Sequence, residues 1–178
     1  MRFKDSPVVE LPVGGAVLSF EQDNSSFHVG TSVWPCSLVL VKFVERWLPP
    51  QNPQNPNPNP NPNPSNPYAD LLRLAGKRGI ELGSGCGPAG LGFDFVVAAD
   101  VVYLADSAPH LVAAIDALLA PRGLLLLAYQ LRSPDAHRAF WDLCARAFPV
   151  VVKVPRDHLH PDYAFDEADV YLMQRQQT

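Results

Sequence analysis

The chain has 178 residues, a formal net charge of −4 and a hydrophobic fraction of 47%. This length suits one domain, and the hydrophobic content is enough for a core. The acidic balance, without a dense stripe of Lys and Arg, argues against nucleic acid as a partner. Apolar runs are too short to cross a bilayer, and the N-terminus lacks a signal-peptide pattern, so we expect no membrane partner. The scattered cysteines form no disulfide framework or zinc site, and we expect a reducing, cytoplasmic or nuclear compartment; they are Cys36, Cys86 and Cys144.

The first elements are a predicted hairpin and a helix. Residues Val8–Leu11 and Ala16–Phe20 flank Gly14-Gly15, a pair that favours a turn between two strands. A helix is expected over Cys36–Leu48, because apolar residues recur there at helical spacing and Pro35 suits its first turn.

Residues 49–67 are of low complexity, dominated by Asn-Pro repeats. Proline removes backbone donors and restricts the residue before it, so we expect a disordered or polyproline-like insertion within the domain. A ligand for a proline-recognition domain is the alternative, although specificity residues are missing. A helix over Tyr68–Ala75, ended by Gly76, follows.

The rest of the chain alternates between strand and helix patterns. Such alternation predicts an α/β fold with a mostly parallel sheet. The expected strands are 78–82, 93–99, 124–129, 150–154 and 169–173, and the expected helices are 107–120, with Ser107 as its cap and Pro121-Arg122-Gly123 as its end, and 133–148.

A glycine-rich turn follows the first of these strands. Gly83, Gly85 and Gly87 alternate with other residues, and glycine lets the backbone approach a ligand closely. The dinucleotide pattern would need a further glycine where Pro88 stands, which argues against an NAD-binding oxidoreductase. The preceding Glu81-Leu82 points instead to S-adenosylmethionine, and an ordinary tight turn is the alternative.

Three segments in order carry a family resemblance: Gly30-Thr31-Ser32-Val33-Trp34-Pro35, then Ile80 to Gly90 around the glycine-rich turn, then Ala99-Asp100-Val101-Val102-Tyr103. Together they resemble methyltransferase family 16, the seven-strand protein-lysine methyltransferases. The resemblance implies a Rossmann-like class I methyltransferase sheet. It also implies S-adenosylmethionine as cofactor and a protein substrate methylated on a lysine side chain.

The family also implies roles for individual residues. Its cofactor-binding positions are a tryptophan against the cofactor, an acid near the amino group, a glycine turn and a wall after the fourth strand; they fall on Trp34, Glu81, Gly83, Ser84, Gly85, Gly87 and Ala99. Its D-x-x-Y signature at the mouth for the acceptor lysine falls on Asp100 and Tyr103, the expected catalytic pair.

This pair suits the chemistry of methyl transfer. An in-line displacement needs an aligned neutral amine more than a strong acid or base. Asp100 can orient the lysine and Tyr103 can form a wall of its channel. The alternatives are core packing for Trp34 and Tyr103 and a strand-end cap for Asp100. Histidines and acids show no metal-ligand spacing, so no metal is expected.

Two strand–helix units of the family, roughly 60 residues, are missing between Gly83 and Phe93. We therefore expect the strand order 1-4-5-7-6, a first strand at the sheet edge, and a largely extended return from Gly83 to Asp94. In the family, the missing part holds the acid that binds the cofactor ribose. We therefore hypothesise that this chain binds the cofactor weakly or not at all. A non-catalytic interaction module is the alternative function. In an alternative assignment, the strand over 93–99 would occupy the second-strand position of the family sheet, and Asp100 would bind the ribose.

Overall fold

The computed structural model describes residues 6–23, 25, 32–48, 66–83 and 92–175. Its helices and strands are β1 (Val8–Val13), β2 (Ala16–Glu21), α1 (Pro35–Trp47), β3 (Gly79–Leu82), β4 (Phe93–Ala99), α2 (Ala108–Leu118), β5 (Leu119–Gln130), α3 (Pro134–Ala147), β6 (Val150–Lys153) and β7 (Ala168–Gln174), with short 3₁₀ turns at Ala105–Ser107 and Arg156–His158. No described helix is both long and apolar enough to cross a membrane.

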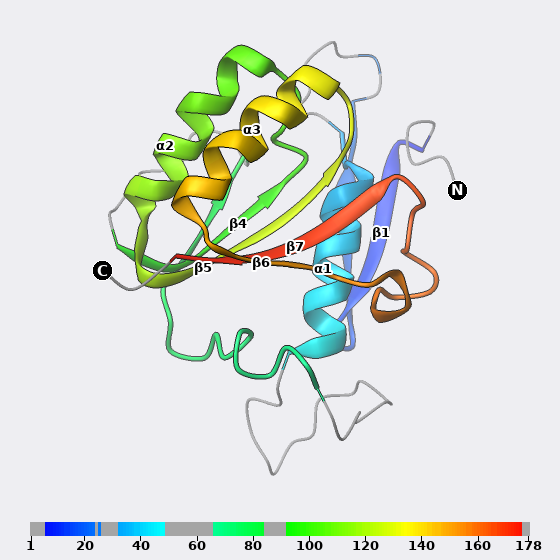
Figure 1. Ribbon diagram of the computed structural model, residues 1–178. Coiled ribbons are helices and arrows are strands. Elements are labelled where there is room, and N and C mark those ends of the chain that lie inside the picture. Colours follow the sequence, from blue (N-terminus) through cyan, green and yellow to red (C-terminus); the bar gives the residue numbers. More distant parts are fainter. Residues whose placement is uncertain (1–5, 24, 26–31, 49–65, 84–91, 176–178) are drawn as a thin grey trace.

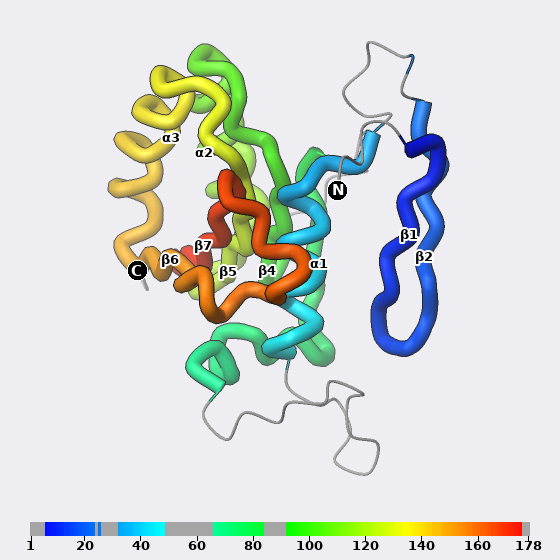
Figure 2. Tube along the Cα trace, turned by 90° about the vertical axis from the view of Figure 1, so that its right-hand side faces the viewer, coloured from blue at the N-terminus to red at the C-terminus, as the bar shows by residue number. Residues whose placement is uncertain are grey.

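The elements form layers (Figures 1 and 2). Helices α2 and α3 cover one face of the central sheet, and α1 covers the other face. The β1–β2 hairpin packs on the outer side of α1, where Val9 and Leu11 contact Leu38. The predicted hairpin is confirmed, and it stands apart from the main sheet.

The central sheet has five strands in the order β3-β4-β5-β7-β6. The strands β3, β4 and β5 are parallel, and β7 runs antiparallel to both β5 and β6. This α/β architecture and this order confirm the expected 1-4-5-7-6 arrangement. Because β4 lies between β3 and β5, it occupies the fourth-strand position. The alternative assignment of residues 93–99 to the second-strand position is therefore wrong.

The short connection between β3 and β4 closes as a parallel pair, with Gly79 opposite Phe95 and Leu82 opposite Ala98. The return ends beside the start of β3: Arg78 donates its backbone N–H to the Asp94 carboxylate at 2.9 Å and its guanidinium to the Gly92 carbonyl at 2.5 Å. Residues 84–91 lie outside the described part. Among the described strands, β3 is an edge strand, as expected.

Helix α1 buries two faces, which explains its apolar composition. Val39 and Phe43 pack toward the sheet, whereas Leu38 packs toward the hairpin. Pro35 occupies the first turn, where its missing N–H costs no helical hydrogen bond. Val41 matches the helical spacing but is 38% exposed, so it lies outside both buried faces.

The predicted helix over Tyr68–Ala75 is wrong, because the structure has successive turns there. Leu72 N–H donates to the Tyr68 carbonyl at 2.9 Å, but the next bond, from Leu74 to Leu72, breaks the helical pattern. A segment this short gains too few hydrogen bonds to offset helix nucleation. The expectation for residues 49–65 lies outside the described residues, and Asn66 beyond them donates to the Trp47 carbonyl at 2.6 Å.

The boundary between α2 and β5 also differs from the prediction. The helix ends at Leu118, and β5 begins at Leu119, so Pro121-Arg122-Gly123 lies inside the strand. Arg122 has a φ of +64°, and the β4–β5 register shifts at this place. The irregular start keeps Leu119 buried. Ser107 makes no capping hydrogen bond to α2, because it ends a 3₁₀ turn instead.

Candidate functional site

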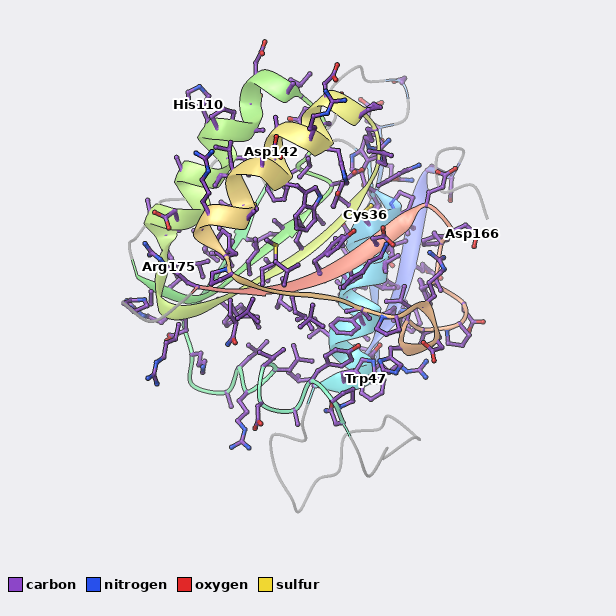
Figure 3. All side chains as sticks on the ribbon, in the orientation of Figure 1. Cys36, Trp47, His110, Asp142, Asp166 and Arg175 are labelled. Atoms are coloured by element: carbon purple, nitrogen blue, oxygen red, sulfur yellow. The ribbon has the colours of Figure 1, made fainter. Side chains whose placement is uncertain are left out.

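The site lies where the parallel strands β3, β4 and β5 reach their carboxyl ends. We call this end of the sheet the ligand edge. Gly83, Asp100 and Arg132 follow these three strands closely. The carboxyl ends of parallel strands form the usual ligand crevice of open α/β sheets. The start of α1 lies at the same edge: Trp34 contacts Arg132, and Cys36 lies at the opposite end of α1 from Trp47 (Figure 3).

Asp100 forms an ion pair with Arg132. The Arg132 Nε lies 2.9 and 3.0 Å from the two carboxylate oxygens of Asp100, and Arg132 Nη2 also donates to this carboxylate. The Asp100 side chain is only 5% exposed and that of Arg132 is 30% exposed. The carboxylate raises the pKa of the Arg132 guanidinium. This forked geometry fixes the carboxylate in one orientation.

The guanidinium of Arg132 also lies over the ring of Trp34, with Cζ 4.6 Å from the ring centroid. Trp34 is half-buried and immediately precedes α1. None of the core clusters formed by the described residues includes Trp34. Thus Arg132 joins two residues that the sequence assigns to cofactor and catalysis.

The backbone of Asp100 extends the sheet before it turns. Its N–H donates to the Ala128 carbonyl at 2.8 Å, and its φ is +58°. Asp tolerates this left-handed conformation better than most residues. The residue therefore ends the strand, as the alternative interpretation expected, and also directs its carboxylate toward Arg132.

Cys36, in the first turn of α1, feels the charges of this ion pair. Burial first, and then the negative charge of Asp100, raise the pKa of its thiol to about 12. Its side chain is fully buried. A thiol in this environment stays protonated, so Cys36 is a packing residue of the site and not a nucleophile.

The other cofactor-binding candidates divide into described and undescribed residues. Gly83 has a φ of +95°, and a Cβ added there would lie 3.0 Å from Val101 Cγ1. Ala99 is half-buried and packs toward the α1 side, whereas Glu81 is exposed near the end of β3. The remaining predicted residues of the turn lie outside the described residues; they are Ser84, Gly85 and Gly87.

Tyr103 lies three residues beyond Asp100 and is 45% exposed. Its neighbour Val102 is 3% exposed and packs under α2 and α3. The alternative prediction that Tyr103 packs in the core is thus wrong, and its ring is accessible to a substrate. The catalytic role of Asp100 and Tyr103 remains a prediction.

Arg132 was not identified from the sequence, although a signal was present. Arg132 stands three positions beyond the strongly apolar strand predicted over 124–129. Because this strand is parallel to its neighbour, a charged residue after it should lie at the ligand edge. Among the described residues, no group of three or more His, Cys, Asp or Glu could hold a metal.

The described residues fit one part of an S-adenosylmethionine molecule. A left-handed glycine without room for a larger side chain, as at Gly83, lets a ligand approach the backbone. Ala99 and Trp34 provide apolar surface at the same edge. On the far side of β3, however, the described residues supply no strand with an acid for the ribose hydroxyls.

Comparison with solved structures defines the class of fold. A Thermus thermophilus 16S rRNA N2 G1207 methyltransferase, solved in complex with AdoMet and guanosine, aligns with 98% of this chain at 16% identity and a TM-score of 0.52. The chain spans 46% of that protein's length. A CurJ carbon methyltransferase aligns with 50% of the chain and 31% of its own length, at 16% identity and a TM-score of 0.34. The fold is that of a Rossmann-like methyltransferase.

The sequence then defines the family. A family model described as lysine methyltransferase matches residues 14–93 and 91–146. The chain belongs to this family, whose members are S-adenosylmethionine-dependent methyltransferases. The two matches overlap at residues 91–93, at the start of β4, next to the place where the sequence predicts the missing units. A comparison with curated proteins gives no match.

Proposed function

We propose that this chain transfers a methyl group from S-adenosylmethionine to the ε-amine of a lysine in a protein. The observation that carries this proposal is the convergence of Trp34, Gly83 and Asp100 at one sheet edge. These residues are separated along the sequence, and the family match spans Trp34 and Gly83 in its first segment and Asp100 in its second.

The cofactor supplies an electrophilic methyl group on a positively charged sulfur. The chain has to hold a neutral amine in line with that group and exclude misaligned approaches. A buried carboxylate at Asp100 offers an acceptor for the amine N–H groups. The exposed ring of Tyr103 supplies an apolar wall at the entrance.

Arg132 sets a condition on this role of Asp100. The carboxylate is already neutralised by the guanidinium, so it attracts a cationic lysine only weakly. Arg132 is 30% exposed and can move, whereas Asp100 is fixed under it. We infer that productive binding of a lysine side chain displaces at least one hydrogen bond of Arg132.

Charge supports a protein substrate over RNA. The solved neighbour acts on 16S rRNA, but this chain has a net charge of −4. Binding of RNA would need a concentrated set of Lys and Arg to neutralise phosphates. A protein segment that presents a lysine is attracted to an acidic surface instead.

The five-stranded sheet favours a second candidate, a non-catalytic interaction module. With β3 at the edge of the described sheet, the ribose acid of the second strand has no counterpart. Each lost hydrogen bond weakens binding by about 1 kcal/mol or more, so two or three lost bonds weaken it by roughly 10- to 1,000-fold. Methyl transfer under saturating cofactor separates the two candidates.

The test is transfer of tritium from methyl-labelled S-adenosylmethionine. The substrates are a protein extract, the same extract with its lysines blocked by acetylation, and purified RNA. The proposal expects label only in the unblocked protein, and none with a folded Gly85→Arg variant. Label in RNA, or equal label in blocked protein, contradicts it, and no label in any fraction favours the interaction module.

A further inference from the structure

The outer hairpin has an apolar strand that the described residues leave uncovered. Every residue of β2 is exposed, and its large apolar residues are open to solvent: Val17 is 61%, Leu18 45% and Phe20 38% exposed. Leu18 and Phe20 lie on one face of this strand and Val17 lies on the other, because side chains alternate along a strand. Neighbouring exposed apolar side chains of this kind mark an interaction surface.

The register shows that Leu18 and Phe20 continue a buried face. Leu18 pairs with Leu11, and Phe20 pairs with Val9. Val9 and Leu11 are 3% and 2% exposed because Leu38 of α1 packs on them. Directly opposite residues of an antiparallel pair point to the same face, so Leu18 and Phe20 extend this face beyond the cover that α1 provides.

The strand also has a free edge. Within the described residues, β2 pairs with β1 alone, so half of its backbone N–H and C=O groups face outward. An edge of this kind accepts an extended peptide as an additional strand, with side chains placed on alternate faces.

Charge identifies the kind of partner. Between Ser6 and Asp23 the sequence holds Glu10 and Glu21 but neither Lys, Arg nor His. Both glutamates are exposed, and no ion pair among the described residues neutralises them. An apolar edge with acidic flanks complements a segment in which apolar and basic residues alternate.

The open end of the hairpin is attached to the candidate site. Gln22 follows β2, and its side-chain oxygen accepts a hydrogen bond from the Val33 N–H at 2.6 Å. Val33 precedes Trp34, whose ring lies under Arg132. A strand added along β2 therefore points toward the sheet edge that holds Asp100.

We propose that β2 binds an extended, lysine-containing segment of the protein substrate as a third strand of the hairpin. Leu18 and Phe20 contact its apolar side chains, and Glu10 and Glu21 attract its cations. The nature of the partner rests on the proposed lysine methylation, but the binding itself needs no cofactor.

The probe is a fluorescein-labelled peptide of alternating lysine and valine, measured by fluorescence polarisation with the whole chain. We expect saturable binding that salt weakens. A Leu18→Ser/Phe20→Ser variant should bind at least tenfold more weakly. A Glu10→Gln/Glu21→Gln variant should bind a few-fold more weakly, with less dependence on salt. A peptide with N-methylated backbone at alternate residues should not bind.

The matched control is Val150→Ser/Val151→Ser. These valines are also exposed, at 47% and 41%, on another edge strand, β6, and their substitution should leave binding unchanged. Circular dichroism confirms that each variant is folded. The proposal is overturned if the wild type does not bind, if both double-serine variants bind equally, or if a glutamate–valine peptide binds as well.

Two further measurements distinguish the possible failures. Sedimentation shows whether this surface instead holds a second copy: a dimer that Leu18→Ser/Phe20→Ser dissociates would overturn the proposal. Titration with S-adenosylhomocysteine is independent of the hairpin. Peptide binding without cofactor binding would refute the enzymatic function and leave the docking surface intact, and the reverse result would refute the docking surface alone.

Discussion

The ion pair between Asp100 and Arg132 gives the most quantitative test of the site. Arg132→Met keeps the aliphatic stem but leaves a carboxylate that is 5% exposed without its cation. Removing one partner of a fully buried pair costs about 3–5 kcal/mol. Because the arginine side chain is 30% exposed, solvent screening reduces the expected cost to about 2 kcal/mol.

The assay is a double-mutant cycle with Arg132→Met, Asp100→Asn and the double variant, followed by urea and thermal unfolding. A loss of about 2 kcal/mol lowers the melting temperature of a chain of this size by about 4–8 °C. The coupling energy between the two residues should exceed about 1 kcal/mol. Loss of the contact with Trp34 adds about 0.5–1 kcal/mol to the cost of Arg132→Met alone.

The control is Arg138→Met on α3. Its ion pair with Asp135 is 3.7 Å long, and both side chains are more than 70% exposed, so stability should change by less than about 0.5 kcal/mol. A coupling energy below about 0.5 kcal/mol between Asp100 and Arg132 would refute the reasoning, because a fixed, buried carboxylate cannot lose its cation without cost.

Three other predictions concern packing and backbone. Burial raises the pKa of Cys36 and Cys144 to about 12, above the ordinary value of 9, so unfolding releases protons above pH 9. The free energy of unfolding should therefore fall, for each thiol, by about 1.4 kcal/mol per pH unit between pH 9 and 12. Cys144→Ala should reduce this slope, measured by urea unfolding at each pH. An unchanged slope would contradict the prediction. Gly79→Ala places a Cβ 2.1 Å from the Phe95 ring, so it should cost about 1–3 kcal/mol; a Phe95→Leu background that does not reduce this cost contradicts the steric cause. Gly83→Ala and Gly76→Ala each place a side chain at a left-handed φ, which should lower the free energy of unfolding by about 1 kcal/mol. Only Gly83→Ala should also weaken the binding of S-adenosylhomocysteine in calorimetry. Equal weakening by both variants would place the ligand elsewhere.

The order of the sheet could be predicted because sequence motifs fix it. The glycine-rich turn marks the first strand, and Ala99–Tyr103 marks the end of the fourth, so the short distance between them implies that two strands are missing. Long apolar runs then predict the buried strands correctly, because few other environments accept them. The hairpin was predicted from Gly14-Gly15, which has the positive φ values such a turn requires.

The errors lie where local pattern and tertiary packing disagree. Residues 68–75 have helical composition, but burial of Tyr68 and Leu72 is achieved by turns. Pro121-Arg122-Gly123 reads as a helix end and a loop, yet pairing with β4 draws it into a strand. Sequence spacing also cannot show that Arg132 returns to Asp100 over 32 positions, because this contact depends on the β4–β5 register.

The most direct test of the central claim is calorimetric titration of the whole chain with S-adenosylhomocysteine, beside a Gly85→Arg variant. The account predicts saturable binding with a Kd of roughly 10 µM to 1 mM, because the turn at Gly83 remains while the contacts of the second strand are lost. The variant should not bind. Absence of binding up to millimolar ligand by a folded, monodisperse chain would contradict the claim that this sheet edge holds the methyl donor.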